Sequence, residues 1–421
     1  MPQQWLGNAT LDRRRFLRGI TATAGLTVAG PTIRSAFGAE EVTGSSRVNS
    51  VAVIGAGIIG ASIAYNLVKR GCEVVVIEKN APASQASGNS FAWINASYFE
   101  SSHSYYTLRT HSLNEYHRLA QDVEIPIRWG GSLEWYESAE QQTEVIEGVR
   151  RIQGSGAPTW LIDAATASAI EPNVRIDPGR QIAWCTRDGA IDPAGTTRAL
   201  LDRVVGYGGA VFHPATVTEI TQQRNGVRVV SNVGAFDADL AVVAAGIGAS
   251  DIAKMIGLDI DPLRPATPGI IVTTEPMEPL LNTVAYTSDT HFHQRSDGRV
   301  VIGEKAGPPQ TDQHQAVLNG RPNAFPITEP ANEHTTRIID IAKRYVPRLA
   351  NAKVERVGVG WRPLPRDGLP IVGHPKAVPG IYLAAMHSGV TLAPIIGHLA
   401  AMEILDDVRV DLLADFRYER F

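Results

Sequence analysis

The chain has 421 residues, which is enough for two or three domains of ordinary size. Hydrophobic residues make up 44% and charged residues 19%, so the composition is that of a globular protein and excludes a disordered, collagen-like or coiled-coil chain. The 39 Lys and Arg against 43 Asp and Glu give a net charge of −4, and because no basic block follows the first 20 residues, we expect no nucleic-acid partner.

Residues 1–39 are interpreted as an export signal that is removed from the mature chain. Residues 12–18 (Asp-Arg-Arg-Arg-Phe-Leu-Arg) resemble the bacterial twin-arginine pattern of a polar residue, two arginines, any residue and then Phe-Leu-Lys. The weakly apolar stretch 19–33 is shorter than the about 20 residues of a membrane span, and residues 36–39 form a small-residue cleavage site. A disordered basic tail or a nucleic-acid-binding arm is the alternative. The resemblance implies a periplasmic or secreted protein that is exported already folded.

The mature chain opens with the pattern of a βαβ unit. Residues 51–54 (Val-Ala-Val-Ile) predict a buried parallel strand, and Gly-Ala-Gly-Ile-Ile-Gly follows at 55–60. Residues 61–70 have helical periodicity, and residues 74–77 (Val-Val-Val-Ile) predict a second strand. Glu78 ends that strand, 23 residues after the first glycine. Both strands, the helix and the acidic residue together are the fingerprint of a dinucleotide-binding unit.

Each residue of this fingerprint has a physical role. Gly55 allows the tight turn, Gly57 lets the backbone approach a pyrophosphate, and Gly60 lets the helix pack on the strand. The pyrophosphate would lie at the N-terminus of the helix, where free N–H groups and the helix dipole favour an anion. Glu78 would accept hydrogen bonds from the ribose hydroxyls.

The fingerprint itself does not distinguish FAD from NAD, so the later elements matter. Residues 84–90 (Ser-Gln-Ala-Ser-Gly-Asn-Ser) form a loop that can bring the backbone close to a ligand, although a solvent-exposed loop has the same composition. The further elements predicted are a helix from Asp192 to near Gly206, short strands at Val211 and 217–220, a buried strand at 238–246, and a strand at 380–386 that leads into a long apolar helix.

Residues 360–373 (Gly-Trp-Arg-Pro-Leu-Pro-Arg-Asp-Gly-Leu-Pro-Ile-Val-Gly) and 387–394 (His-Ser-Gly-Val-Thr-Leu-Ala-Pro) complete a resemblance to a known family. With the βαβ unit, they resemble the FAD-dependent amino acid and amine oxidoreductases of the D-amino acid oxidase and glycine oxidase type, over about residues 48–410. The resemblance implies an α/β fold in which a Rossmann-like FAD-binding domain of glutathione-reductase type carries an inserted α+β substrate domain with a mixed, mainly antiparallel sheet. The implied ranges are 48–100, 191–259 and 351–421 for the discontinuous FAD-binding domain, and 101–190 and 260–350 for the substrate domain.

The resemblance also implies which residues contact FAD. Residues 387–391 would open the last helix beneath the flavin, with backbone N–H groups facing N1 and the C2 carbonyl; a simple helix cap is the compatible alternative. Neither Cys72 nor Cys185 matches a tether position of the family, so non-covalent FAD is expected. The candidate cofactor-binding residues are Gly55, Gly57, Ile58, Ile59, Gly60, Glu78, Lys79, Ser87, Gly88, Asn89, Ser90, Val217, Ala245, Gly246, Arg362, His387, Ser388, Gly389, Val390 and Thr391.

Three residues are candidates for contact with the substrate. Arg362 matches the family arginine that clamps a substrate carboxylate, and a surface arginine before a turn is the alternative. Strand alternation places His291 and His293 on one face, and His291 stands where the family has a tyrosine that contacts the carboxylate. Both histidines could equally be structural or solvent-facing, and without a third ligand no metal site is expected. Tyr286 is a further candidate for the pocket.

The resemblance therefore implies an enzyme that oxidises a small amino acid or amine. The substrate expected is a D-amino acid or a glycine-like or secondary amino acid, oxidised to the imine by hydride transfer to flavin N5 and then hydrolysed to the oxo acid. The electron acceptor would be oxygen or a respiratory carrier, and peripheral membrane association and the oligomeric state are left open. The alternatives are an FAD-bearing subunit of a multi-subunit amine or opine-type dehydrogenase, and a nicotinamide-dependent dehydrogenase.

Overall fold

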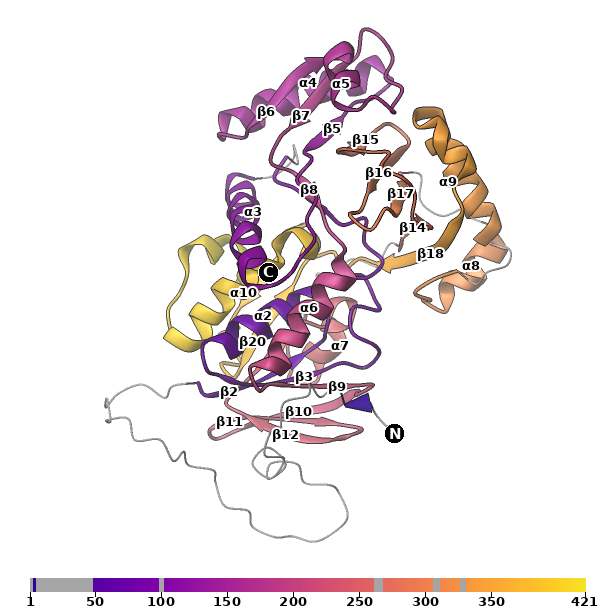
Figure 1. Cartoon of the computed structure of the whole chain (residues 1–421). Coiled ribbons are helices and arrows are strands. Elements are labelled where there is room, and N and C mark those ends of the chain that lie inside the picture. The colour runs from indigo at the N-terminus through magenta and orange to yellow at the C-terminus, as the bar shows by residue number, and fades with distance from the viewer. Residues whose placement is uncertain (1–2, 5–47, 98–101, 261–267, 306–310, 326–330) are drawn as a thin grey trace.

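Two large β-sheets occupy separate halves of the computed structural model, which describes residues 3–4, 48–97, 102–260, 268–305, 311–325 and 331–421 (Figure 1). The export signal predicted for residues 1–39 lies outside the described residues except for Gln3–Gln4. Those two residues form strand β1, which pairs antiparallel with β9 (Ala210–His213) at one edge of the first sheet.

Parallel strands form the centre of the first, seven-stranded sheet. Its order is β1, β9, β3 (Glu73–Ile77), β2 (Ser50–Ile54), β13 (Leu240–Val243), β20 (Ile381–Ala385) and β19 (Ile371–Gly373). Strands β9, β3, β2, β13 and β20 are parallel, while β19 is added antiparallel at the other edge. The predicted βαβ unit is confirmed as β2, α2 (Ile58–Lys69) and β3.

This sheet is buried on both faces, which explains the continuous apolar runs in its strands. Val51 and Val53 pack into one core and Ala52 and Ile54 into another. The helices on the first face are α2, α3 (His103–Asp122), α6 (Pro193–Gly206) and α10 (Gly389–Asp406). The elements on the opposite face are β10 (Val217–Gln223), β11 (Gly226–Ser231) and β12 (Gly234–Ala238), which form an antiparallel sheet, and α7 (Ala249–Lys254).

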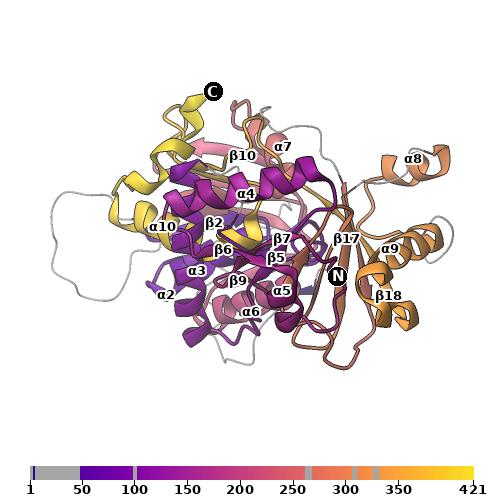
Figure 2. The ribbon, with the colours of Figure 1, turned by 90° about the horizontal axis from the view of Figure 1, so that it is seen from above.

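The second sheet has eight strands and is antiparallel except where β15 pairs with β5. Its order is β18 (Val354–Trp361), β14 (Pro268–Thr274), β17 (Val300–Glu304), β16 (Thr290–Gln294), β15 (Val284–Tyr286), β5 (Ser132–Glu134), β7 (Gln181–Cys185) and β6 (Thr159–Asp163). Helix α9 (Ala331–Tyr345) packs on β16, β17 and β18, and Figure 2 shows it from above beside β17. The remaining elements are α4 (Ala139–Gly154), α5 (Ala164–Ile170), α8 (Asp312–Asn319), the two-stranded sheet of β4 (Trp93–Ile94) and β8 (Gly189–Ala190), and the 3-10 turns η2 (Gly246–Gly248), η3 (Pro347–Asn351), η4 (Asp411–Phe416) and η5 (Tyr418–Arg420).

The predicted fold class is confirmed, because a Rossmann-like sheet and a mixed, mainly antiparallel sheet are both present. Two segments differ from the predicted domain ranges. Helix α3 falls in the range 101–190, but its buried Leu108 and Leu113 pack in the core with α2 and α10. Strand β18 falls in the range 351–421, but it pairs with β14 in the second sheet. Both departures come from packing partners that are distant in the sequence.

Helix α10 is apolar because it is a core helix. By length and composition it could span a membrane, but 72% of this stretch is buried inside the protein, where α10 packs on α2 and α3. Its last turns carry Glu403, whose carboxylate is 3% exposed and pairs with Arg417, 9% exposed. The Tyr382 hydroxyl and the Val410 N–H also donate hydrogen bonds to this carboxylate, at 2.8 Å each. Burial alone would raise the pKa of Glu403, but these bonds outweigh burial and lower it.

We expect Glu403→Gln to lower the free energy of unfolding by about 3–5 kcal/mol, because it leaves the Arg417 guanidinium buried without a counter-charge. Urea unfolding at neutral pH measures this. Because the pKa of Glu403 is lowered, the contribution is present at neutral pH and lost as the pH falls through that lowered pKa. The matched control is Asp406→Asn, also on α10, which breaks an exposed pair with Arg70 at the end of α2 and should cost less than about 1 kcal/mol. Equal losses in the two variants would contradict the assignment.

Candidate functional site

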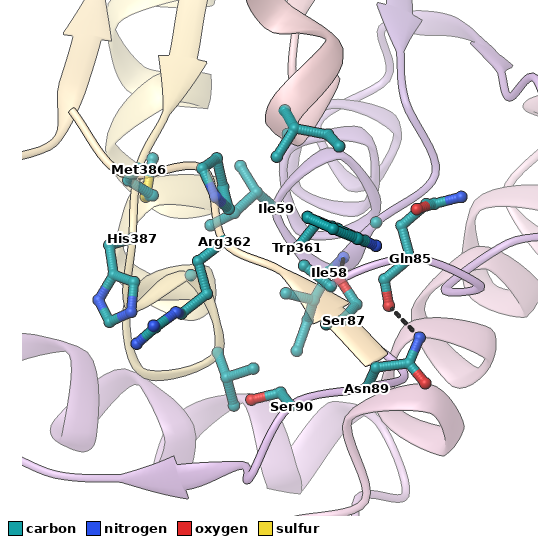
Figure 3. Close-up of a pocket in the computed structure, with 18 of the residues that line it drawn as sticks. Ile58, Ile59, Gln85, Ser87, Asn89, Ser90, Trp361, Arg362, Met386 and His387 are labelled. Atoms are coloured by element: carbon teal, nitrogen blue, oxygen red, sulfur yellow. Dashed lines mark hydrogen bonds between the residues drawn. The ribbon is translucent and has the colours of Figure 1, made fainter. Parts of the chain in front are cut away.

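A cavity of about 1060 Å³ lies between the two sheets. This volume is at the upper end of the about 300–1,000 Å³ that is usual for small-molecule and cofactor sites. The cavity extends from the glycine-rich turn after β2 to strands β15 and β16 and the start of α10, so both sheets contribute walls. Figure 3 shows Arg362 and His387 close together at one end of the view, and Ser87 and Asn89 on the other side.

The glycine-rich turn between β2 and α2 brings the backbone to the cavity wall. Gly55 has a φ of +110°, and a Cβ there would lie 2.5 Å from the carbonyl oxygen of Ala244. A Cβ at Gly60 would lie 2.0 Å from the carbonyl oxygen of Gly55, so Gly60 allows α2 to pack on the turn. Gly57 is the N-cap of α2 and offers no side-chain cap, which leaves first-turn N–H groups beyond that of Ile58 to a ligand.

Glu78 at the end of β3 fixes this turn. Its Oε2 accepts a hydrogen bond from the N–H of Ala56 at 2.8 Å, and its Oε1 accepts one from the N–H of Asn80 at 2.8 Å. The residue also lines the cavity. Because an ionised carboxylate has about four acceptor positions, it retains capacity for a ribose hydroxyl.

The loop of small residues lies against the N-terminus of α2. The Ser87 hydroxyl accepts a hydrogen bond from the N–H of Ile58 at 3.0 Å, and a Cβ at Gly57 would lie 3.1 Å from the same oxygen. The Asn89 side chain donates to the carbonyl oxygen of Gln85 at 2.8 Å, which closes the loop (Figure 3). The loop is therefore built into the cavity wall and is not a solvent loop.

The N-terminus of α10 forms a second uncapped helix end at the cavity. Ser388, its N-cap, has a left-handed backbone with φ of +51° and makes no side-chain cap hydrogen bond. Non-glycine residues in this conformation are uncommon and occur often at functional sites. Gly389 lies against Ile59, since a Cβ there would be 3.2 Å from the Ile59 side chain. The Tyr116 hydroxyl donates to the carbonyl oxygen of Val390, so α3 holds this end in place.

The structure brings nearly all predicted site residues to this one cavity. Gly60 and Gly88 are the two that do not line it: Gly60 packs on Gly55, and a Cβ at Gly88 would lie 2.3 Å from the carbonyl oxygen of Ala83. Both glycines allow close backbone packing behind the wall. The lining residues are Gly55, Gly57, Ile58, Ile59, Glu78, Lys79, Ser87, Asn89, Ser90, Val217, Ala245, Gly246, Tyr286, His291, Arg362, His387, Ser388, Gly389, Val390 and Thr391.

The buried carboxylate of Asp188 joins segments that pass between the two sheets. It accepts hydrogen bonds from the Trp93 indole at 3.1 Å, the Ser132 hydroxyl at 2.7 Å, the Ala96 N–H at 3.1 Å and the Ser97 hydroxyl. Burial raises the pKa of Asp188, and these hydrogen bonds oppose the rise. The bonds fix the indole of Trp93, which lines the cavity.

The second sheet presents Tyr286 and His291 to the cavity from neighbouring strands, as paired residues of β15 and β16. Their rings stack at 5.4 Å, and Phe91 meets the His291 ring edge-on at 4.3 Å. Burial, together with the positive charge of Lys305, lowers the pKa of His291 to about 3, so the imidazole is neutral at pH 7. A Cβ at Gly303 would lie 2.0 Å from His291 Nε2, so this ring needs a glycine on β17.

His293 lies on the same face of β16 as His291, as alternation predicts, since its ring also contacts Phe91, at 4.9 Å. Its Nε2 is 2.7 Å from the carbonyl oxygen of Phe91. Burial lowers the pKa of His293 to about 4. His293 does not line the cavity, so it has a structural role beside the site.

Arg362 follows β18 and extends into the cavity beside His387 (Figure 3). Burial lowers the pKa of His387 to about 4, with contributions from the positive charges of Arg362 and Arg109. The charge of Arg362 also contributes to the lowered pKa of His291. The charge of Arg362 therefore helps to keep both histidines neutral, at the end of the cavity where α10 begins.

Two residues of this end were not among the sequence candidates. Lys305 lines the cavity directly after β17. Because a lysine after a strand usually faces solvent, the sequence around Lys305 does not indicate that this residue belongs to the site. Trp93 also lines the cavity, and its ring lies 5.6 Å from that of Tyr286, tilted by 33°. A tryptophan after a loop of small residues is usually a core residue, and only the hydrogen bond to Asp188 shows how it is placed.

Comparison with known proteins gives the family. Residues 50–402 match the family model DAO, described as FAD dependent oxidoreductase. The chain is 28% identical to the glycine oxidase of Bacillus licheniformis over 381 residues, which cover 87% of this chain and 96% of that protein. It is 25% identical to one of the subunits of opine oxidase from Agrobacterium tumefaciens over 382 residues, covering 88% and 96%. The crystal structure of glycine oxidase from Geobacillus kaustophilus has the same fold, with a TM-score of 0.78, 23% identity, and coverage of 90% of this chain and 100% of that one.

The residues of the cavity fit the FAD of that family. The N-termini of α2 and α10, whose N-cap residues make no side-chain hydrogen bond, suit a pyrophosphate and an electron-rich ring edge, and Gly57 leaves room for a group beside Ser87. FAD is therefore the cofactor, in preference to a nicotinamide, and it is held without a covalent bond. Neither Cys72 nor Cys185 lines the cavity, in keeping with the predicted absence of a tether.

We expect Gly57→Val to purify with less than about a tenth of the wild-type flavin, because its branched side chain would fill the space beside Ser87 where the pyrophosphate must approach. Visible absorbance per mole of protein measures the flavin, and far-ultraviolet circular dichroism shows whether the chain is folded. The matched control is Gly206→Val, at an exposed helical glycine with open space around it. Full flavin content in a folded Gly57→Val protein would refute the site.

Proposed function

The chain belongs to the DAO family of FAD-dependent oxidoreductases, and from this premise we propose that it oxidises a small amino acid at its amine. As a member of this family it is an FAD-dependent amino acid or amine oxidoreductase. The finer proposal is that the substrate is a D-amino acid or a glycine-like or secondary amino acid. The observation that supports it is the position of Arg362, an arginine in the cavity at the end where α10 begins.

Arg362 and the side chains around it would each contact a different part of such a substrate. The Arg362 guanidinium can form two parallel hydrogen bonds with the substrate carboxylate. His291 lines the cavity and is neutral, and its buried Nδ1 has no hydrogen-bond partner among the described residues. Phe91, Trp93 and Tyr286 surround this end with aromatic rings, which exclude water and orient the substrate carbon.

The proposed reaction is a two-electron oxidation followed by hydrolysis. When bound, FAD supplies the acceptor for the hydride that leaves the substrate carbon. The neutral amine loses a proton as the C=N bond forms, and water then converts the imine to an oxo acid and releases ammonia or an amine. The reduced cofactor would pass its electrons to oxygen or to a respiratory carrier.

A second candidate is an FAD-bearing subunit that needs a partner chain, and the similarity to a protein named as a subunit of an opine oxidase favours it. The two candidates differ in what the purified chain does alone. Anaerobic addition of D- and L-amino acids, glycine, proline and N-methyl amines would bleach the flavin of a self-sufficient enzyme. A flavin that none of these compounds reduces, in a chain that co-purifies with other polypeptides, would favour the second candidate.

We also propose that residues 1–39 direct export by the twin-arginine route, so that the mature enzyme acts in the periplasm or outside the cell. The order of basic, apolar and small residues supports this proposal. A location outside the cytoplasm would bring the enzyme close to membrane-bound respiratory carriers, with which it could associate peripherally.

We expect replacement of Arg13 and Arg14 together by Lys to leave the full-length precursor in the cytoplasm, because the twin-arginine route requires this pair. Cell fractionation followed by immunoblotting with a C-terminal tag measures the location. The control is Arg34→Lys, outside the motif, which should be exported and processed as the wild type is. Export of the double variant to the wild-type extent would contradict the proposal.

We expect Arg362→Ala to lower kcat/KM for an amino acid about 30-fold or more, because the substrate carboxylate loses its charge-assisted partner. Arg362→Lys should recover only part of this, since an ammonium cannot reproduce the bidentate contact. The control is Arg366→Ala, an exposed arginine that does not line the cavity.

The informative comparison for Arg362 is an amino acid beside its decarboxylated amine. A clamp makes the wild type prefer the amino acid, and Arg362→Ala should lose most of this preference while keeping its flavin spectrum. Equal losses with the two substrates would show that Arg362 acts on the cofactor or the fold, and the amino-acid proposal would give way to oxidation of simple amines.

A further inference from the structure

Lys305 places a second positive charge in the substrate end of the cavity. It follows β17 directly, and its ammonium lies between two aromatic rings, 4.0 Å from the centre of Tyr136 and 4.1 Å from that of Tyr286. Such contacts stabilise the charged form without using its N–H donors. Burial lowers the pKa of Lys305 to about 8, and the negative charges of Glu134 and Asp289 oppose this, so the ammonium form predominates at pH 7.

The donors of this ammonium remain unused. Among the described side chains and backbone groups, no acceptor lies within hydrogen-bond distance of Lys305 Nζ, and no carboxylate lies within 4.0 Å of it. The neighbouring acids have other partners: Glu134 accepts from the Tyr136 hydroxyl, and Asp289 pairs with Arg344. Burial raises the pKa of Glu134 to about 7, which weakens it further as a counter-charge.

Lys305 and Arg362 act on the same region of the cavity. Lys305 lies over the Tyr286 ring, which stacks on His291, and Arg362 lines the same cavity. His291 and His387 are neutral at pH 7, and Glu304, beside Lys305, pairs with Arg337. The substrate end therefore holds two cationic side chains, and the single carboxylate of a simple amino acid could bind only one of them.

We propose that Lys305 binds a second carboxylate, and that the preferred substrates are amino acids with two carboxylates. The inference rests on the proposed function, since it assigns Arg362 to the first carboxylate. Two kinds of compound share the chemistry: an acidic amino acid, with the second carboxylate on its side chain, and an N-carboxyalkyl amino acid, with the second carboxylate beyond the nitrogen. In either compound the second carboxylate would accept hydrogen bonds directly from the Lys305 ammonium.

The experiment titrates the oxidised holoenzyme with carboxylates that it cannot oxidise, and follows the change in flavin absorbance. Malonate, succinate and glutarate are compared with acetate, propionate and butyrate. We expect the best dicarboxylate to bind about tenfold or more tightly than the monocarboxylate that lacks its second carboxyl group, as acetate does for malonate, propionate for succinate and butyrate for glutarate. Lys305→Met should abolish most of this ratio while leaving the affinity for the monocarboxylate nearly unchanged.

The matched control is Lys353→Met, the same substitution at an exposed lysine just before β18, which should keep the wild-type ratio. The flavin content and visible spectrum of each variant show that it is folded. A wild type without a preference for dicarboxylates, or a Lys305→Met variant with the wild-type ratio, would overturn the inference.

A second arm uses oxidisable compounds and separates the two kinds of substrate. Iminodiacetate is compared with N-methylglycine, and aspartate of each chirality with alanine of the same chirality, by anaerobic flavin reduction. Faster reduction by the dicarboxylate in either pair, lost in Lys305→Met, supports the inference and locates the second carboxylate. Reduction by the amines with no advantage for either dicarboxylate overturns the inference alone. A flavin that no amine reduces overturns the proposed function, while the titration still reports on Lys305.

Discussion

The cavity depends on the buried carboxylate of Asp188, because this group fixes the chain where it passes between the two sheets. Its four hydrogen bonds reach Trp93, Ala96, Ser97 and Ser132, and the last of these begins β5 of the second sheet. A carboxylate is buried at a high cost unless its oxygens are satisfied, so the four donors must be in place together. The wall that carries Trp93 is thereby held at a fixed distance from Tyr286 on β15.

The two sheets contribute different kinds of electrostatics to this shared space. The seven-stranded sheet offers backbone dipoles: the uncapped ends of α2 and α10 and glycines that bring the main chain close. These suit a large cofactor whose charge is spread over many atoms. The eight-stranded sheet offers full charges on Arg362 and Lys305, set among aromatic rings. These suit a small, compactly charged substrate, so the two sheets offer different electrostatics to the cofactor and to the substrate within one cavity.

The parts of the site that sequence predicts well are those whose partners are near in the chain. The turn at Gly55, the helix α2 and Glu78 lie within one βαβ unit, where the spacing of the residues dictates their contacts. The start of α10 was also predictable, because a strand, a glycine and an apolar helix follow one another. The surroundings of Lys305 were not, since Tyr136 approaches it from far away in the sequence through the parallel pairing of β5 with β15. Helix α3 was assigned to the wrong domain range for the same reason, because α10, on which it packs, is distant in the sequence.

His291 stands where the family resemblance predicts a tyrosine. A neutral ring at this position is compatible with the two cations that the eight-stranded sheet places in the cavity. A protonated His291 would be repelled by the positive charges of Lys305 and Arg362, but burial and those charges lower its pKa and keep it neutral. A neutral imidazole can donate or accept at Nδ1, the atom without a partner among the described residues. Gly303 leaves the space for its Nε2 edge, so the ring is positioned by shape and not by a charge. An anionic substrate would offset the two cations without removing the effect of burial, so the imidazole stays neutral when the cavity is filled. Under the proposed function, the two cations would bind the anionic groups of the substrate, and His291 would keep the same protonation state when the substrate binds.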